Sequence, residues 1–453
     1  MAAQILAICI FVGMFLLIIL DKFERYYITL ASGALVLALV FGVCMHSMSA
    51  IWGTLNLPSI FTSGFWYGAS EEGNSGINWS TIFFIAGMMI MVEGLGKAGF
   101  FRWLCLTLAK LVRYRIVPLL VCFMVLSAVL SMFIDSITVV LFLATVTLEL
   151  AQTMKFNPIP MILSEVFCAN LGGAATMCGD PPNIIVGTSL GYTFFDFISN
   201  TGGAVAICFV LVLIYFVLCF RKRLLRDEKN SGAAVCPQPG TAITNRPAFL
   251  LSAGVFLLAV ILLATHAQTK LTVACIGVIV AALSLVVIGC TSGGKAVLEI
   301  IKGVDYKTLL FFIGLFVSVA GLKETGVLDV IARFITTVSG GNAAIIVVII
   351  LWISAVTSAF VDNIPFAATM IPVVRSIAAA SGIDMGVLAW ALSLGTDLGG
   401  NATPIGASAN VVGTSVAAKG GYPISWGVYC KYCVGATVLV IAVSMGYLFL
   451  RYL

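Results

Sequence analysis

Apolar runs of about 20 residues, separated by short polar or charged segments, recur along the whole chain. A helix needs about 20 predominantly apolar residues to cross the hydrocarbon core of a bilayer. Uninterrupted runs lie at 4–20, 27–44, 79–96, 203–220, 247–266, 271–290, 306–322 and 426–450. The pattern predicts an all-α polytopic membrane protein, in which the first apolar run is a retained helix.

Two apolar stretches are interrupted near their middle by a short polar segment. The interruption in 116–153 contains Asp135, and the interruption in 343–379 contains Asp362. A charged side chain at the centre of a spanning helix costs at least about 2.5–3.5 kcal/mol on insertion scales, so each aspartate needs a reason. We expect two re-entrant helix–turn–helix hairpins with half-length arms, each with its aspartate at the tip.

Two other apolar stretches, 160–190 and 383–416, contain glycines, prolines and polar residues where a membrane helix would be expected. Such backbone is tolerated at membrane depth only where it is buried in protein or lines a cavity. We therefore expect one broken helix in each half of the chain. Broken helices in corresponding halves are the best indication that a sequence gives of a transporter's binding site.

The two halves of the sequence repeat at a constant offset of 227 residues. Asp135 meets Asp362 at this offset, and the break that ends at Asn183 meets the break that ends at Asn410 without a gap. Because each half is expected to have five crossings and one hairpin, the second half would be inserted upside down. The predicted inverted-topology repeats cover residues 1–220 and 247–453. A cytoplasmic linker, residues 221–246, is predicted to join them.

The composition agrees with a membrane protein, since 61% of the 453 residues are hydrophobic, 9% are charged and the mean hydropathy is +1.13. Soluble domains contain about 25% charged residues. Cytoplasmic loops carry an excess of Lys and Arg, and the predicted topology places 19 of the 24 inside, with both termini outside. The net charge of +5 therefore reflects topology and does not indicate a nucleic-acid partner.

We expect the two tips and the two breaks to meet near the membrane midplane and to form one binding site. Half-helix N-termini suit an anionic solute, and unwound carbonyls suit a coupling cation. The candidate substrate- and ion-binding residues are Asp135, Ser136, Asn170, Gly172, Gly173, Thr176, Gly179, Asp180, Asn183, Asp362, Asn363, Asp397, Gly399, Gly400, Asn401, Thr403 and Asn410. The expected Na⁺ ligands are Asp135, Asn183, Asp362 and Asn410.

The aspartates also have a simpler explanation, because an aspartate that precedes a helix caps it. Asp135 and Asp362 could cap the helices that follow them, and one residue can serve both capping and transport. Asp180 and Asp397 lie opposite Ala407 and Asn170 in the repeat, which leaves a purely structural role open for both. Apart from a coupling ion, Na⁺ or H⁺, we expect no cofactor.

At Asn170–Asn183, Asp135, Asp362-Asn363 and Leu398–Asn410 the chain resembles the ion transporter superfamily. This superfamily includes arsenite permeases, the melanosomal P protein, related Na⁺/H⁺ antiporters, citrate transporters and divalent anion/sodium symporters. The resemblance covers nearly the whole chain and implies a scaffold domain for homodimerisation and a transport domain that moves as an elevator. The tips carry aspartate where dicarboxylate symporters carry Ser-Asn-Thr, and in this they resemble the arsenite permease and P-protein branch.

We therefore expect a secondary active transporter of the plasma (inner) membrane that moves a small anion or a neutral oxyacid, arsenite-like or organic, coupled to H⁺ or Na⁺. The alternatives in this class are a Na⁺/H⁺ antiporter and a Na⁺-coupled citrate or dicarboxylate symporter. A passive ion channel is the alternative from a different class, because broken helices also build channel filters. No histidine cluster, nucleophile motif or metal-ligand spacing indicates an enzyme.

Overall fold

The computed structural model describes residues 1–20, 22–68, 76–230 and 237–453. Within these ranges the regular structure is helical, apart from one isolated bridge between Tyr67 and Leu271. Ten of the described helices are long and apolar enough to cross a membrane. The predicted all-α polytopic membrane fold is therefore confirmed.

The first half of the chain runs from α1 to α12. Its helices are α1 (Ala2–Leu20), α2 (Arg25–Leu35), which continues as the π-helix η1 (Val36–Cys44), α3 (Met48–Leu55), η2 (Leu57–Phe61), α4 (Ser63–Trp66), α5 (Trp79–Lys97), α6 (Phe100–Leu111), α7 (Ile116–Ser131), α8 (Ser136–Met154), α9 (Ile159–Gly173), α10 (Pro181–Leu190), α11 (Phe194–Phe197), η3 (Ile198–Gly202) and α12 (Gly203–Asn230). α12 is longer than expected, because it continues into the predicted linker.

The second half begins after a short helical turn, η4 (Pro239–Ala242). Its helices are α13 (Arg246–Thr269), α14 (Val273–Ser292), α15 (Gly294–Gly303), α16 (Tyr306–Glu324), α17 (Val327–Val338), α18 (Ala343–Ser358), α19 (Asn363–Ser381), α20 (Met385–Gly399), η5 (Gly400–Ala402), α21 (Ser408–Lys419) and α22 (Trp426–Tyr452). These helices occupy every apolar run that the sequence pattern selected in this half.

Helix boundaries recur at the offset seen in the sequence. α5 and α16 are both 19 residues long, and the helices that follow them have equal lengths in the two halves, with 12, 16, 19 and 15 residues. The residues before α5 and α16 even cap them alike, since Asn78 accepts a hydrogen bond from the Thr81 amide (3.1 Å) and Asp305 from the Thr308 amide (3.2 Å). These equalities support the duplication, whereas the opposite insertion of the two halves stays a prediction.

The two predicted hairpins are formed by α7 with α8 and by α18 with α19. Their arms are longer than the half-length arms we expected, with 16 residues before each tip and 19 after it. At a rise of 1.5 Å per residue, 19 residues extend for roughly 28 Å, which is close to the hydrocarbon thickness of a bilayer. α8 and α19 accordingly rank among the ten candidate spans, so length alone does not make these hairpins re-entrant.

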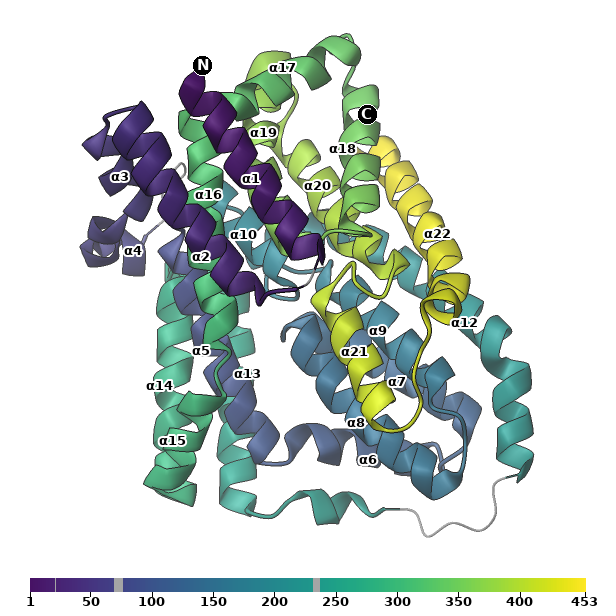
Figure 1. Cartoon of the computed structure of the whole chain (residues 1–453). Coiled ribbons are helices and arrows are strands. Elements are labelled where there is room, and N and C mark those ends of the chain that lie inside the picture. Colours follow the sequence, from purple (N-terminus) through teal and green to yellow (C-terminus); the bar gives the residue numbers. More distant parts are fainter. Residues whose placement is uncertain (21, 69–75, 231–236) are drawn as a thin grey trace.

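One part of the molecule, the long-helix group, consists of α1, α2, α5, α13, α14 and α16 and lies on the left in Figure 1. In this group, helices of the first half pack against helices of the second half: α5 packs against α14, and α2 packs against α16. Glycines permit both contacts: a Cβ atom at Gly87 would lie 2.2 Å from the Gly277 carbonyl oxygen, and one at Gly314 would lie 2.3 Å from the Thr29 carbonyl carbon. The two pairs of backbones are therefore in direct contact.

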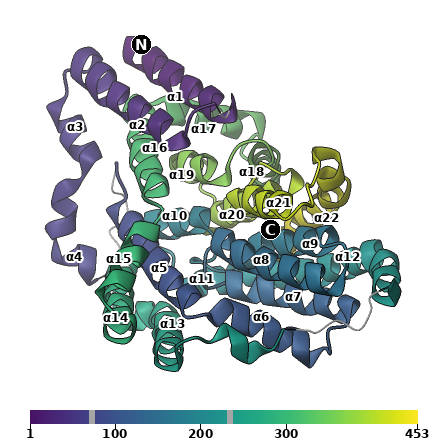
Figure 2. The same ribbon diagram turned by 60° about the horizontal axis from the view of Figure 1, so that its bottom comes forward.

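The other part, the hairpin group, contains both hairpins, both broken helices, α12 and α22 (Figures 1 and 2). The first arms of the broken helices, α9 and α20, are enclosed, since every residue of 160–173 and 386–399 is buried. A Cβ atom at Gly172 would lie 2.1 Å from the Ala128 carbonyl oxygen of α7. The non-helical residues 174–180 of the first break are also buried, as their position in an apolar run requires, whereas Ile405 in the second break is exposed.

Candidate functional site

The two hairpin tips begin the second arms of the hairpins with an aspartate. Asp135 accepts hydrogen bonds from the backbone amide (2.9 Å) and the hydroxyl (2.8 Å) of Thr138. Asp362 accepts one from the Ile364 amide (3.1 Å). Both aspartates therefore cap helices, as the simpler explanation of the sequence required. Their other contacts differ, because Asp362 also binds groups from other helices.

Asp180 connects the two tips. It is 2% exposed and directly precedes α10. One carboxylate oxygen accepts a hydrogen bond from the Ser136 hydroxyl (2.6 Å) of the first tip, and the other accepts one from the Asn363 amide (2.9 Å) of the second tip. The side chain of Asp180 forms no cap hydrogen bond with α10. Its carboxylate therefore links the tips of both halves, with one oxygen bonded to each tip.

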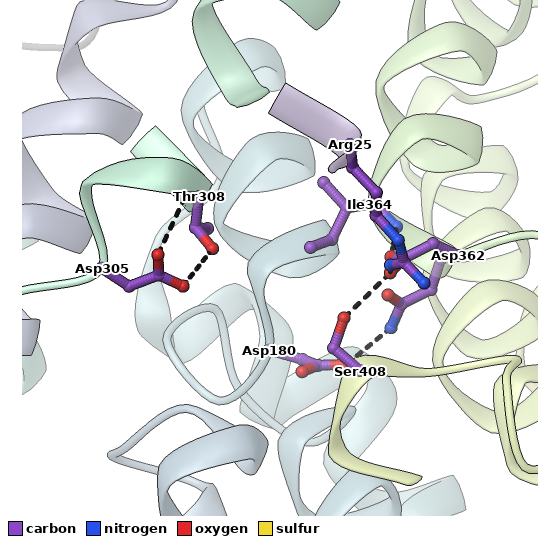
Figure 3. Close-up of polar contacts among 8 residues, drawn as sticks. Arg25, Asp180, Asp305, Thr308, Asp362, Ile364 and Ser408 are labelled. Atoms are coloured by element: carbon purple, nitrogen blue, oxygen red, sulfur yellow. Dashed lines mark hydrogen bonds and ion pairs between the residues drawn. The ribbon is translucent and has the colours of Figure 1, made fainter. Parts of the chain in front are cut away.

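Arg25, in the first turn of α2, reaches the second tip from the long-helix group. Its guanidinium lies 2.5 Å from an Asp362 carboxylate oxygen, which also accepts a hydrogen bond from the Ser408 hydroxyl (2.9 Å). The side chain of Asp362 is 3% exposed and that of Arg25 is 32% exposed. Figure 3 shows Arg25 and Ser408 approaching Asp362, with Asp180 nearby. The ion pair therefore joins the two groups of helices at a largely buried carboxylate.

Four helix N-termini meet around these carboxylates. α8 and α19 begin at the tips, and α10 and α21 begin directly after the breaks. The N-terminus of a helix carries roughly half a positive charge and free N–H groups, which is why anions bind there. Three of the four starts are preceded by an aspartate, which offsets this positive potential. The site therefore combines helix N-termini that can bind an anion with carboxylates of the protein itself, which would compete with a bound anion for the same N–H groups.

A cavity of about 260 Å³, which we call the tip cavity, opens beside the tips. Its lining includes Asp135, Asp362, Arg25 and Ser408, together with Lys307 at the start of α16. The rest of the lining is largely apolar, from α5, α10 and α16. The cavity lies between the long-helix group and the hairpin group, so a solute in it would touch both.

A second cavity of about 930 Å³, the wide cavity, lies toward the opposite ends of α16 and α19. It is lined by Lys323 and Arg375 on those two helices and by residues of α10 such as Thr188. The Arg375 guanidinium donates a hydrogen bond to the Ser189 carbonyl oxygen. α5, α10, α16 and α19 each contribute residues to both cavities.

Asparagines hold the unwound backbone of both breaks. The Asn183 amide donates to the carbonyls of Gly173 (3.1 Å) and Thr176 (3.2 Å). At the equivalent place, the Asn410 amide donates to the carbonyls of Gly400 and Thr403, both at 2.8 Å. The hydroxyls of Thr176 and Thr403 donate to carbonyls at the ends of α7 and α18. The breaks are thus held in shape by hydrogen bonds from within the protein.

The expected Na⁺ ligands do not act as one set in this structure. Asp135 and Asp362 lie at the tip cavity, whereas Asn183 and Asn410 direct their amide groups at the break carbonyls that a cation would otherwise use. Within the described ranges, no group of three or more His, Cys, Asp and Glu side chains is arranged to hold a metal ion. Na⁺ binding at these four residues stays a prediction.

A second polar cluster is buried where α9 and α20 end. The Asn170 amide donates to the side-chain oxygens of Asn401 (2.9 Å) and Asn410 (2.8 Å). Asp397 is 0% exposed, and neither of its carboxylate oxygens has a hydrogen-bond partner. Of the remaining predicted residues, Gly172, Gly173, Gly179, Gly399 and Gly400 allow the close backbone contacts of the breaks.

Sequence reasoning did not select Arg25, Ser408 or Arg375. It also missed Ser393, whose hydroxyl donates a hydrogen bond to the Asn183 side-chain oxygen (2.5 Å). Arg25 is the last residue of what the sequence presents as an ordinary charged turn, and nothing in its neighbourhood points to a partner 337 residues away. Ser408 could have been found from the repeat, because it occupies the position of Pro181, next to an aspartate in the first half. For the other two residues no local signal exists.

Paired breaks, paired hairpins and a cavity between two groups of membrane helices define a membrane transporter. Comparison with known proteins gives the same class. The chain belongs to the CitMHS family, since the family model described as "Citrate transporter" matches residues 15–395. An uncharacterized transporter of Mycobacterium tuberculosis is 33% identical over 99% of both chains, and the 46 kDa membrane protein of Mycobacterium leprae is 32% identical over 99% of both chains.

More distant relatives support the superfamily that the motifs indicated. The human P protein is 27% identical over 83% of this chain, which covers 53% of that protein. Among solved structures, the Alcanivorax borkumensis YdaH transporter has a TM-score of 0.58 at 14% identity and covers 94% of this chain and 96% of its own. The Neisseria gonorrhoeae MtrF efflux pump has a TM-score of 0.55 at 12% identity and covers 90% and 86%. At such low identity these two likenesses concern the fold.

Proposed function

We propose that the protein is a secondary active transporter of a small organic anion of the citrate type, coupled to H⁺ or Na⁺, with its cargo bound in the tip cavity. The observation that carries this proposal is the Arg25–Asp362 ion pair at a place where four helix N-termini meet. The description of the matching family model supports the class of cargo.

The ion pair suggests how an anion would bind. A cargo carboxylate in the tip cavity can replace Asp362 as the partner of Arg25, and the helix N-termini supply further N–H donors. An ionised Asp362 would then lie beside an anion without its arginine, which is costly in a buried place. A proton or a cation at the aspartate removes this cost, so that anion and coupling ion bind together.

An elevator motion is the form of transport that fits this arrangement. Arg25 belongs to the long-helix group, and Asp362 belongs to a tip of the hairpin group. If the hairpin group slides along the long helices, the ion pair must break, and the cargo between the two groups changes sides. The wide cavity on the far side of α10 and α19 would be the second point of access.

The test uses purified full-length protein in proteoliposomes, with radiolabelled citrate as the probe. A pH gradient or a Na⁺ gradient should drive internal citrate above the external concentration, and Arg25→Gln should abolish this accumulation. A passive channel would bring citrate only to equilibrium. No citrate movement under either gradient would refute the proposed cargo.

Arsenite is the second candidate cargo, and one contact favours it. The thiol of Cys178 lines the tip cavity beside the break, and trivalent arsenic binds thiols. Arsenite should then slow citrate exchange in the wild type, and Cys178→Ser should relieve this inhibition. If arsenite has no effect on exchange and is not itself transported, the organic anion remains the proposed cargo.

A further inference from the structure

α12 and α22, the last helices of the two halves, pack against each other at the edge of the hairpin group, away from the long-helix group (Figures 1 and 2). The Cys208 sulfur lies 3.8 Å from the Ser444 hydroxyl oxygen, whereas further along α12 the ring centroids of Phe220 and Tyr432 lie 4.7 Å apart. These contacts show that the two helices run antiparallel. The end of α12 therefore lies beside the beginning of α22.

Each of the two helices exposes a row of apolar side chains that leads to basic residues. On α22, exposed Val434 and Val438 follow exposed Lys431 after three and seven residues. On α12, Arg221 and Lys222 continue the face of an exposed apolar row, which consists of Ile207, Val210, Ile214 and Leu218. Residues three or four positions apart share one face of a helix. Both rows therefore end in cations at the same end of the helix pair.

Tyr432 brings cations of the two helices together. The guanidinium carbon of Arg223 lies 6.0 Å from the centroid of the Tyr432 ring, and the Lys431 ammonium lies 5.8 Å from it. The Tyr215 hydroxyl of α12 donates a hydrogen bond to the Tyr432 carbonyl oxygen (2.9 Å), which fixes α22 against α12 at this level. Tyrosine is enriched where membrane helices leave the hydrocarbon core. The two cations therefore converge at a level that suits a lipid headgroup.

The charge at this end of the helix pair is not neutralised by acidic side chains. Within the described ranges, the ion pairs involve other cations, such as Lys97 with Glu299 and Lys307 with Glu24. Asp227, the next acid along α12, accepts a hydrogen bond from the Asn157 amide (3.2 Å). The exposed cations without such an ion pair, which we call the basic end, are Arg221, Lys222, Arg223, Arg226 and Lys431. The basic end therefore suits an anion from outside the protein.

We propose that the surface formed by α12 and α22 binds an anionic phospholipid, whose phosphate lies at the basic end and whose acyl chains lie along the two apolar rows. Guanidinium and ammonium groups donate charge-assisted hydrogen bonds to phosphate oxygens, and basic sites between membrane helices bind anionic headgroups. The lipid touches the last helix of each half, so its binding stabilises their packing. This inference goes beyond the proposed function and does not depend on the cargo.

The test uses the full-length protein in a neutral detergent, with phosphatidylglycerol as the probe. A lipid that binds only the folded protein raises the unfolding temperature by mass action. Phosphatidylglycerol should raise this temperature and remain bound in native mass spectra, whereas phosphatidylcholine and inorganic phosphate should have little effect. The double variant Arg223→Gln/Lys431→Gln should bind phosphatidylglycerol about 25-fold more weakly, since each basic residue near a membrane surface contributes about 1 kcal/mol, a factor of roughly five.

The matched control removes two other exposed cations, with the double variant Lys295→Gln/Lys302→Gln on α15. It should respond to phosphatidylglycerol like the wild type, and both double variants should unfold at the wild-type temperature when no lipid is added. An equal loss of the response in the control would overturn the proposal, because general surface charge would then explain the binding. An equal effect of phosphatidylcholine would also overturn it, as would a full effect of inorganic phosphate. The proposal fails as well if the wild type does not respond to phosphatidylglycerol.

Discussion

The guanidinium of Arg25 and the carboxylate of Asp362 lie 2.5 Å apart, although 337 residues separate them in the chain. Arg25 belongs to a helix that packs with α16, and Asp362 is the tip of a hairpin. The pair is thus one of the polar connections between the two groups of helices, as is the hydrogen bond between the hydroxyls of Thr81 on α5 and Thr188 on α10 (2.8 Å).

Removing the cation of this pair should destabilise the protein moderately and impair transport strongly. A fully buried pair that loses one partner costs about 3–5 kcal/mol, but Arg25 is 32% exposed, so we expect Arg25→Gln to cost about 1 kcal/mol. Thermal unfolding in detergent measures this. The matched control is Lys307→Gln, which breaks an exposed pair with Glu24 and should lower the unfolding temperature less. Equal shifts for the two variants would contradict a special role of Arg25.

The donors to Asp180 should be needed for the rate of transport. Ser136→Ala and Asn363→Ala each leave one carboxylate oxygen of Asp180 buried without its donor, which costs about 1–3 kcal/mol. If the tips are correctly placed only when both bonds form, each variant lowers the initial uptake rate about tenfold, since 1.4 kcal/mol corresponds to a factor of ten. Ser381→Ala, which removes a hydrogen bond to the Ile377 carbonyl outside the lining of both cavities, should leave the rate unchanged.

The glycine contact between α5 and α14 should tolerate no side chain. Gly87→Ala would place a methyl group 2.2 Å from the Gly277 carbonyl oxygen, so the helices must separate. We expect a loss of at least about 1–3 kcal/mol, typical of overpacked sites, read as a lower unfolding temperature and poor yield. In contrast, Gly254→Ala meets nothing within 4 Å and should be neutral or stabilising by about 0.5–1 kcal/mol, because alanine favours the helix. A Gly87→Ala protein as stable as the wild type would contradict this prediction, because α5 and α14 could then move apart at little cost.

The basic residues of the wide cavity should attract an anionic cargo from that side. Arg375 lies in its lining together with Lys323, and the two cations are near enough to repel each other. Arg375→Gln should raise the KM for citrate entry from that side several-fold, with a smaller effect at high salt, because steering by charge is screened. Arg333→Gln removes an exposed arginine of α17 and provides the control. An unchanged KM would exclude this role.

The polar interruptions of the apolar runs predicted the parts of the fold that matter most. Asp135 and Asp362 stand out because a charge in an apolar run needs a reason, and both proved to lie at hairpin tips. The glycine-rich breaks were found by the same argument and by their repetition. The arm lengths of the hairpins were not, because an apolar pattern does not show how far a helix continues on each side of an interruption.

The partners of these residues could not be predicted. The contacts of Arg25 with Asp362 and of Asp180 with Asn363 join segments far apart in sequence, and no local pattern encodes which tip meets which helix. The repeat did place Asp397 opposite Asn170, but only the structure shows that Asn170 donates to Asn410 of the other half while both Asp397 oxygens are buried without a hydrogen-bond partner. Side-chain orientation, which decides between donor and acceptor, requires coordinates.

The exchange of partners in the long-helix group has a consequence for biosynthesis. α2 and α5 leave the ribosome early, yet the helices that cover their glycine surfaces, α16 and α14, belong to the second half. Until those helices are made, lipid or the insertion machinery must cover the surface of α2 at Thr29 and the surface of α5 at Gly87. The first half on its own would therefore be an incomplete product, and cells should degrade it unless the second half is supplied, in the same chain or as a separate fragment.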